Sequence, residues 1–118
     1  MPFQPAYKTL EVYLLSKKLV VACYALTHDL PSEEKTNLVQ YIRTAAVTVH
    51  LTIAQGALLK KKKKKNKSIK AVQNALVVIN TSVAVLTEVG LTTEGGASEL
   101  NQLSTTLYQI LDGLKKDK

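Results

Sequence analysis

The sequence has little of what catalysis, disulfide bonding or membrane insertion requires. Its 118 residues include one cysteine, two histidines, one phenylalanine and no tryptophan. The lone Cys23 can form no internal disulfide. No stretch reaches the roughly 18 uninterrupted apolar residues of a membrane span, and the N-terminus lacks the basic start and apolar run of a secretory signal. We therefore expect a cytoplasmic protein with no membrane partner.

Candidate catalytic and metal-binding residues are equally scarce. Cys23 lies among apolar neighbours in a helical pattern, so packing explains it. His28 falls in the last turn of that predicted helix, where an imidazolium interacts favourably with the helix dipole. His50 has no partner at the His-x-x-x-His or Glu-x-x-His spacing of helical metal sites. We expect no enzyme, no catalytic or metal site and no cofactor.

Four segments carry apolar residues at alternating steps of three and four, the spacing that places one apolar stripe on an α-helix. We predict helices over residues 7–28, 33–59, 67–89 and 97–115, in one domain spanning residues 1–118. The apolar stripes of the first, second, third and fourth helix, in that order, are Val12, Leu15, Leu19, Ala22 and Leu26; Leu38, Ile42, Ala45, Val49 and Ile53; Ile69, Val72, Leu76, Ile79, Val83 and Leu86; and Leu100, Leu103, Leu107, Ile110 and Leu114.

Short breaks separate these helices. Pro31 disfavours helix at Leu30, and Ser32 can cap the second helix, with two glutamates in its first turn. Gly90 is typical of a helix C-terminus, and we expect residues 91–96 to form a turn. Short connections between helices of similar length favour antiparallel neighbours. The sequence thus predicts an all-α fold, an antiparallel up-down-up-down four-helix bundle.

Two of the helices are apolar over more of their circumference than a lone bundle uses. A bundle helix needs an apolar face of about three-sevenths. The surplus is either covered by a partner or tolerated as partly exposed valine and alanine. We expect self-association through this surplus, which consists of Leu14, Val21 and Ala25 on the first helix and Val78, Val85 and Val89 on the third.

The net charge of +7 is concentrated in one segment. Residues 60–70 hold eight of the 16 basic residues and none of the nine acidic ones, and the other 107 residues carry a net charge of −1. Because consecutive lysines repel one another, we expect a mobile loop or a frayed helix end there. Its natural ligand is a polyanion, bound with strong salt dependence and without sequence readout, since the segment has no aromatic residue. A lysine run is equally typical of a solvated loop.

Residues 37–56, NLVQYIRTAAVTVHLTIAQG, resemble the second helix of a known family, the bacterial four-helix bundle proteins encoded in intervening sequences of 23S ribosomal RNA genes. That helix reads roughly Leu-x-x-Gln-Leu-Arg-Arg-Ala-Ala-x-Ser-Ile-x-x-Asn-Ile-Ala-Glu-Gly. The departures are Thr44, Thr52, Gln55 and, in the third helix, Val78, where the family has arginine, asparagine, glutamate and an acidic residue. The resemblance extends over nearly the whole chain. It includes positions at the start of the chain, in the first turn and in the third helix: Leu10, Val12 and Tyr13; Leu30, Pro31, Ser32 and Glu34; and Ile69, Ala71, Val72, Leu76, Ile79, Thr81, Val83 and Gly90.

The resemblance implies a cytoplasmic, non-enzymatic bundle that is often a homopentamer. It also implies a relationship to the accessory variability proteins of diversity-generating retroelements, which bind a reverse transcriptase and nucleic acid. One hypothesis is therefore a non-catalytic oligomeric bundle that binds nucleic acid, RNA rather than DNA. The alternative is a protein-interaction scaffold, such as an accessory subunit for a reverse transcriptase. The predicted nucleic-acid contacts are Lys60, Lys61, Lys62, Lys63, Lys64, Lys65, Lys67, Lys70 and Arg43.

Overall fold

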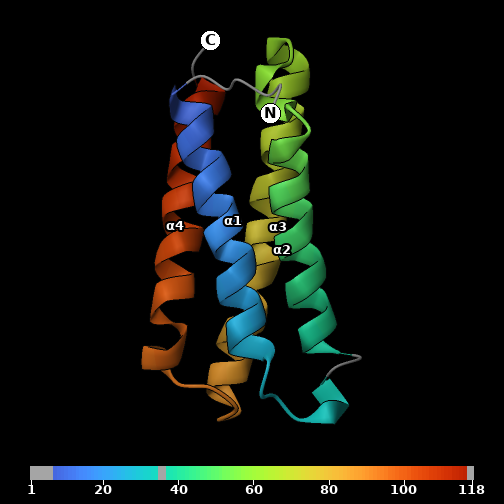
Figure 1. Cartoon of the computed structure of the whole chain (residues 1–118), viewed down its shortest axis with the longest axis vertical. Helices are drawn as coiled ribbons and strands as arrows, with labels where there is room; N and C mark the ends of the chain where they lie inside the picture. The colour runs from blue at the N-terminus through green and yellow to red at the C-terminus, as the bar shows by residue number, and fades with distance from the viewer. Residues whose placement is uncertain (1–6, 35–36, 117–118) are drawn as a thin grey trace.

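Four long helices make up most of the protein (Figure 1), in a computed structural model that describes residues 7–34 and 37–116. Short 3-10 helices, Ser32–Glu34 and Ala57–Leu59, lie in the connections on either side of the second long helix. No strand occurs within the two described ranges, so the prediction of an all-α fold is confirmed. The long helices are α1 (Tyr7–Thr27), α2 (Leu38–Ala54), α3 (Lys62–Glu88) and α4 (Glu94–Lys116).

Each long helix packs against two others. The neighbouring pairs are α1 with α2, α2 with α3, α3 with α4, and α4 with α1, which leaves α1 and α3 across a diagonal. In Figure 1 the connections from α1 to α2 and from α3 to α4 lie at the lower end of the molecule. The connection from α2 to α3 lies at the upper end, where α1 begins and α4 ends.

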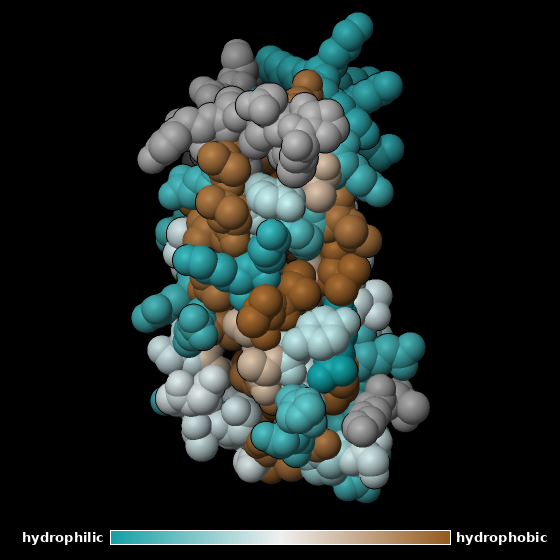
Figure 2. Space-filling model, in the orientation of Figure 1, coloured by the Kyte–Doolittle hydropathy of each residue, from teal (hydrophilic) through white to brown (hydrophobic). Residues whose placement is uncertain are grey.

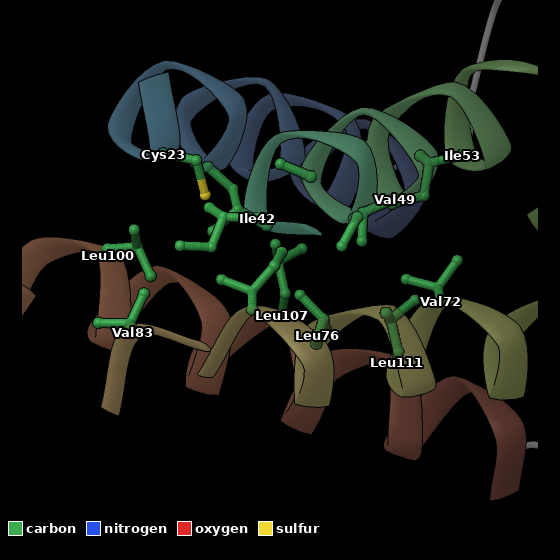
Figure 3. Packing of buried hydrophobic residues seen from close by; sticks show 14 of the residues in the cluster. Cys23, Ile42, Val49, Ile53, Val72, Leu76, Val83, Leu100, Leu107 and Leu111 are labelled. Atoms are coloured by element: carbon green, nitrogen blue, oxygen red, sulfur yellow. The ribbon is translucent and has the colours of Figure 1, made fainter. Parts of the chain in front are cut away.

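Buried apolar side chains from all four helices meet along the centre of the molecule (Figure 3). Every residue of the predicted α3 stripe is buried, and those of the other three stripes are buried or partly buried. Full burial of one such aliphatic side chain contributes roughly 1.5–3 kcal/mol. The core is therefore the main attraction between the helices, and each helix supplies at least one fully buried residue: Leu19, Ile42, Leu76 and Leu107.

The end of α3 agrees with the sequence prediction. Gly90 has a φ of 82°. Its amide donates to the carbonyl oxygen of Thr87 at 3.1 Å, and the amide of Leu91 donates to that of Leu86 at 2.9 Å. These two bonds form a Schellman motif, whose positive φ glycine adopts without strain. The predicted stop at Gly90 is confirmed.

Both predicted ends of the second helix were wrong. Ser32 belongs to a 3-10 helix instead of capping α2, which begins at Leu38. Residues 35 and 36, inside the predicted range, lie outside the described residues. The helix ends at Ala54 rather than near residue 59, because Gly56 takes a φ of 79° and turns the chain out of the helix.

The last two helices begin earlier than predicted. The amide of Gly96 donates to Oγ1 of Thr93 at 2.9 Å, which is the geometry of an N-cap. Gly95 and Gly96, expected in a turn, therefore lie in the first turn of α4. The start of α3 at Lys62 instead of residue 67 brings most of the lysine segment into a helix.

Among the described helices, α3 is long and apolar enough to cross a membrane. In its most apolar stretch of 18 residues, 44% is buried inside the bundle. Core helices of soluble proteins pass the same test. The buried stripe explains the apolar character of one side of α3. On its other side, Val77, Val78 and Val85 are exposed, and so is Val89 at the C-cap.

Candidate nucleic-acid interface

The lysine segment lies at the end of the molecule where α2 connects to α3 (Figure 1). Lys60 and Lys61 belong to the connection, and α3 begins at Lys62. Of the two predicted alternatives, a mobile loop or a frayed helix end, the loop is therefore wrong from Lys62 onward. Lysine has a good intrinsic helix propensity, and the buried Ile69 and Val72 hold the following turns against the core. Together these outweigh the repulsion between the lysines.

These lysine side chains face solvent. Seven of the eight are exposed, and Lys65 is partly buried. Figure 2 shows hydrophilic side chains projecting from the same end of the molecule. We use the name lysine cluster for Lys60, Lys61, Lys62, Lys63, Lys64, Lys65, Lys67 and Lys70.

The lysine cluster makes the start of α3 electrostatically unfavourable. The first four amide groups of a helix have no intrahelical acceptor and carry partial positive charge. The first turn of α3 contains no acidic residue, and Lys61 at the N-cap makes no side-chain hydrogen bond to the helix. Lysines three or four positions apart also repel one another. A bound anion would relieve both sources of repulsion.

The opposite end of the molecule is acidic. Six of the nine acidic residues lie in, or within two turns of, the connections from α1 to α2 and from α3 to α4. The charge is thus separated into a positive end and a negative end, which steers an approaching polyanion toward the lysine cluster. The six acidic residues are Asp29, Glu33, Glu34, Glu88, Glu94 and Glu99.

Arg43, the ninth predicted contact residue, lies apart from the lysine cluster. Its Nε donates to Oγ1 of Thr27 at 2.8 Å, and its guanidinium carbon lies 4.3 Å from the centre of the Tyr24 ring. Between Arg43 and the end of α2 lie about 17 Å of helix. The structure therefore does not bring Arg43 to the lysines. It joins the beginning of α2 to the end of α1.

A second polar contact joins α1 to α2. Oγ of Ser16 and Nδ1 of His50 are 2.8 Å apart, and the imidazole lies 5.0 Å from the Tyr13 ring. Nothing in the sequence pattern pairs these two residues. The one sign of the contact in the sequence is Ser16, a polar residue between Val12 and Leu19 at a core position of the apolar repeat.

A serine beside a histidine is also the arrangement of nucleophilic catalysis. Ser16, however, is completely buried, and its hydroxyl donates to the carbonyl oxygen of Tyr13 at 2.8 Å. Because the Ser16 hydroxyl proton is used in the bond to Tyr13, the hydroxyl oxygen accepts a hydrogen bond from Nδ1–H of His50 and does not donate to it. The geometry supports a structural contact between the helices.

Stability should depend on pH through His50. Burial lowers the pKa of His50 below its ordinary 6.5, and the charge of Lys17 lowers it further. The unfolded chain therefore binds more protons than the folded protein as the pH falls through 6.5. Stability is full above this pH and decreases below it. We expect the Tm to fall between about pH 7.5 and pH 5, and His50→Gln to flatten this part of the profile.

Circular dichroism melts at a series of pH values would measure the effect. His28→Gln is the matched control, because it makes the same substitution at an exposed histidine in the turn after α1. An equal decrease of Tm in His50→Gln and in the unmodified protein would show that another group is responsible.

The remaining candidate residues have simple environments. Cys23 is fully buried, and burial raises its pKa to about 12, so its thiol stays protonated at neutral pH. Within residues 7–34 and 37–116, no three histidine, cysteine, aspartate or glutamate side chains come together as a metal site would require.

A comparison with protein-family models identifies the family. The model described as 23S rRNA-intervening sequence protein matches residues 8–113, which include nearly all of the four helices. The chain belongs to this family. A search of curated proteins found no match. The resemblance of residues 37–56 to the 23S rRNA-intervening sequence proteins is thereby confirmed, and the match includes the whole lysine cluster. The family description names no reaction and no ligand.

Proposed function

We propose that this protein is a non-catalytic, oligomeric bundle that binds nucleic acid through the lysine cluster. The observation that carries the proposal is a group of eight lysines, seven of them exposed, at the start of a 27-residue helix. Phosphate groups would neutralise the lysines and accept hydrogen bonds from the unpaired amides of the first turn. The preference for RNA over DNA rests on the association of the family with 23S rRNA genes.

Binding of this kind is to the phosphate backbone. No aromatic residue lies in the lysine cluster, so stacking on bases is absent from it. Eight phosphate contacts on a duplex give a slope of about −7 in a plot of log affinity against log salt concentration. We therefore expect strong salt dependence and little discrimination between sequences.

A variant with Lys60 to Lys65 all replaced by glutamine tests the proposal. Its affinity for a short RNA hairpin should fall at least about 100-fold at low salt, and the salt slope should become shallower by about 5. Fluorescence anisotropy titrations at several salt concentrations measure both quantities. Helical content, followed by circular dichroism, should stay the same.

Arg43→Gln is the control for this experiment. It also removes a positive charge, but from a residue hydrogen-bonded to α1 and far from the lysine cluster. Its RNA affinity should equal that of the unmodified protein. Unchanged RNA affinity in the six-lysine variant would falsify the proposal.

We also infer that the four helices run up, down, up, down. The two polar contacts between α1 and α2 support this order, because Ser16 meets His50 whereas the later Thr27 meets the earlier Arg43. Further support comes from the connections in Figure 1, which lie at alternate ends of the molecule.

The proposed protein acts in the cytoplasm as a homo-oligomer, for which the family resemblance implies a pentamer. Exposed apolar side chains on α1 and α3 support self-association. The same side chains favour the second candidate, a scaffold related to the retroelement accessory proteins that binds a reverse transcriptase. If the protein binds a reverse transcriptase with an affinity that does not depend on salt, and the six-lysine variant binds equally well, the scaffold is favoured.

A further inference from the structure

The 3-10 helix Ala57–Leu59 presents an apolar side chain at the end of the molecule that carries the lysine cluster. A 3-10 helix has three residues per turn, so its successive side chains point in three different directions. Ala57 and Leu58 are 3% and 7% exposed, and this short helix packs against both α2 and α3. The third direction is left for Leu59, which points into solvent and is 54% exposed.

The backbone holds Leu59 in this position. Gly56 turns the chain out of α2 with a φ of 79°. The amide of Leu59 donates to the carbonyl oxygen of Gly56 at 2.9 Å, and the amide of Lys60 donates to that of Ala57 at 3.5 Å. Because the turn is hydrogen-bonded and two of its three side chains are buried, little backbone entropy is lost when Leu59 meets a ligand.

Leu59 borders the lysine cluster. Single exposed apolar residues are common on protein surfaces, and most need no explanation. Leu59 differs because it directly precedes Lys60 and Lys61, both exposed, which are the first two members of the cluster. Figure 2 shows hydrophobic surface among the hydrophilic side chains at this end of the molecule. An apolar group beside a phosphate-binding surface meets the other parts of the nucleic acid, its bases and riboses.

Unpaired bases offer a matching surface for such a side chain. In a continuous RNA duplex the base faces are stacked on one another, and the deep, narrow major groove keeps side chains from the base edges. In a single strand, loop or bulge the faces are open, and every base has them. Leucine is among the apolar side chains that pack against bases where stacking is interrupted.

We propose that Leu59 packs against an unpaired base of an RNA whose neighbouring phosphates lie on the lysine cluster. The inference rests on the proposed function and names the substrate class of the same site, RNA with single-stranded nucleotides. An apolar contact to a base face distinguishes unpaired from paired RNA without reading the sequence. It therefore agrees with the weak sequence discrimination expected of the cluster.

A lipid surface also attracts lysines with apolar side chains beside them, but it matches this end of the molecule less well. Peripheral membrane binding of this kind buries the whole apolar face of an amphipathic helix in the lipid. Within residues 56–70, the one exposed large apolar side chain is Leu59. A single leucine is enough to cover part of one base, whereas it offers a membrane very little area.

Leu59→Ser tests the contact with two RNAs, a short single-stranded oligouridylate and a long RNA duplex, in fluorescence anisotropy titrations. Leu59 is about half exposed, so packing against a base recovers only part of the effect of full burial. Its affinity for the oligouridylate should fall about three- to ten-fold. The affinity for the duplex should not change. The salt slope should stay the same for both RNAs, because no phosphate contact is lost.

Leu59→Phe should have the opposite effect. An aromatic ring stacks on base faces more strongly than an aliphatic side chain packs against them, so this variant should bind the oligouridylate more tightly than the unmodified protein. Val77→Ser is the matched control. Val77 is 50% exposed but lies about 22 Å along α3 from Lys62, and its loss should leave both RNA affinities unchanged.

Three results for Leu59→Ser would overturn the inference. The variant could bind the oligouridylate as tightly as the unmodified protein, it could lose affinity for both RNAs equally, or it could lose affinity for phosphatidylserine vesicles while RNA binding is unchanged. The proposed function survives each of these results, because it depends on the six-lysine variant. If the unmodified protein binds neither RNA, the proposed function and this inference are both overturned.

Discussion

Replacing Lys62, Lys63 and Lys64 with glutamate should stabilise the protein and at the same time abolish the RNA binding that we propose. All three residues lie in the first turn of α3, where cations oppose the helix dipole and no acidic residue balances them. An anion in the first turn is favourable by about 0.3–1 kcal/mol per site. The three changes should therefore raise the free energy of unfolding by about 1–3 kcal/mol at low ionic strength. Urea denaturation would measure the gain, which salt should reduce.

A matched variant separates the two effects. Lys67→Glu combined with Lys70→Glu reverses charges on the same helix, but beyond its first turn, where the dipole effect has faded. This double variant should also bind RNA poorly, with no comparable gain in stability. A loss of stability in the variant of Lys62, Lys63 and Lys64 would mean that the lysines support the fold, and our account of the start of α3 would be wrong.

The largest loss of stability should follow Leu76→Ala. Leu76 is fully buried near the middle of α3 and belongs to the apolar core, to which Leu107 of α4 also contributes (Figure 3). Removing a leucine side chain from such a site costs about 2–5 kcal/mol, through lost burial and the cavity left behind. Since domains of this size unfold with roughly 5–15 kcal/mol, the change removes a large part of the total.

The neighbouring Val77→Ala is the control for this prediction. Val77 is 50% exposed and faces away from the core, so its truncation should change the free energy of unfolding by about 0.5 kcal/mol or less. Urea denaturation followed by circular dichroism compares the two variants. Equal losses in both would contradict the core assignment for α3.

Features that depend on near neighbours in the sequence were predictable. The α3 stripe from Ile69 to Leu86 is buried because the spacing of apolar residues alone determines which side of a helix meets the core. The stop at Gly90 follows from the backbone freedom of a single residue. The same reasoning applied to Gly56 would have located the end of α2, and Thr93 would have located the start of α4. The lysine segment was harder, because helix propensity and charge repulsion oppose each other there.

Contacts between distant residues were not predictable in the same way. Periodicity says which side of a helix a residue occupies, but not which polar group it meets on the next helix. Ser16 and His50 are 34 positions apart, and Arg43 reaches Thr27 across 16. The acidic end depends on the fold too, since Asp29 and Glu94 lie at the same end only because two connections meet there.

The position of the lysine cluster at one end of the molecule has a consequence for the homo-oligomer proposed above. The exposed apolar side chains of α1 and α3 include no residue of the cluster, so contacts between copies through those side chains would leave each cluster free for ligand. Once one cluster holds an RNA, its neighbours meet the same strand at an effective concentration that can reach the millimolar range. Avidity then rises with RNA length, and an assembly of individually weak sites would retain long transcripts while releasing short fragments.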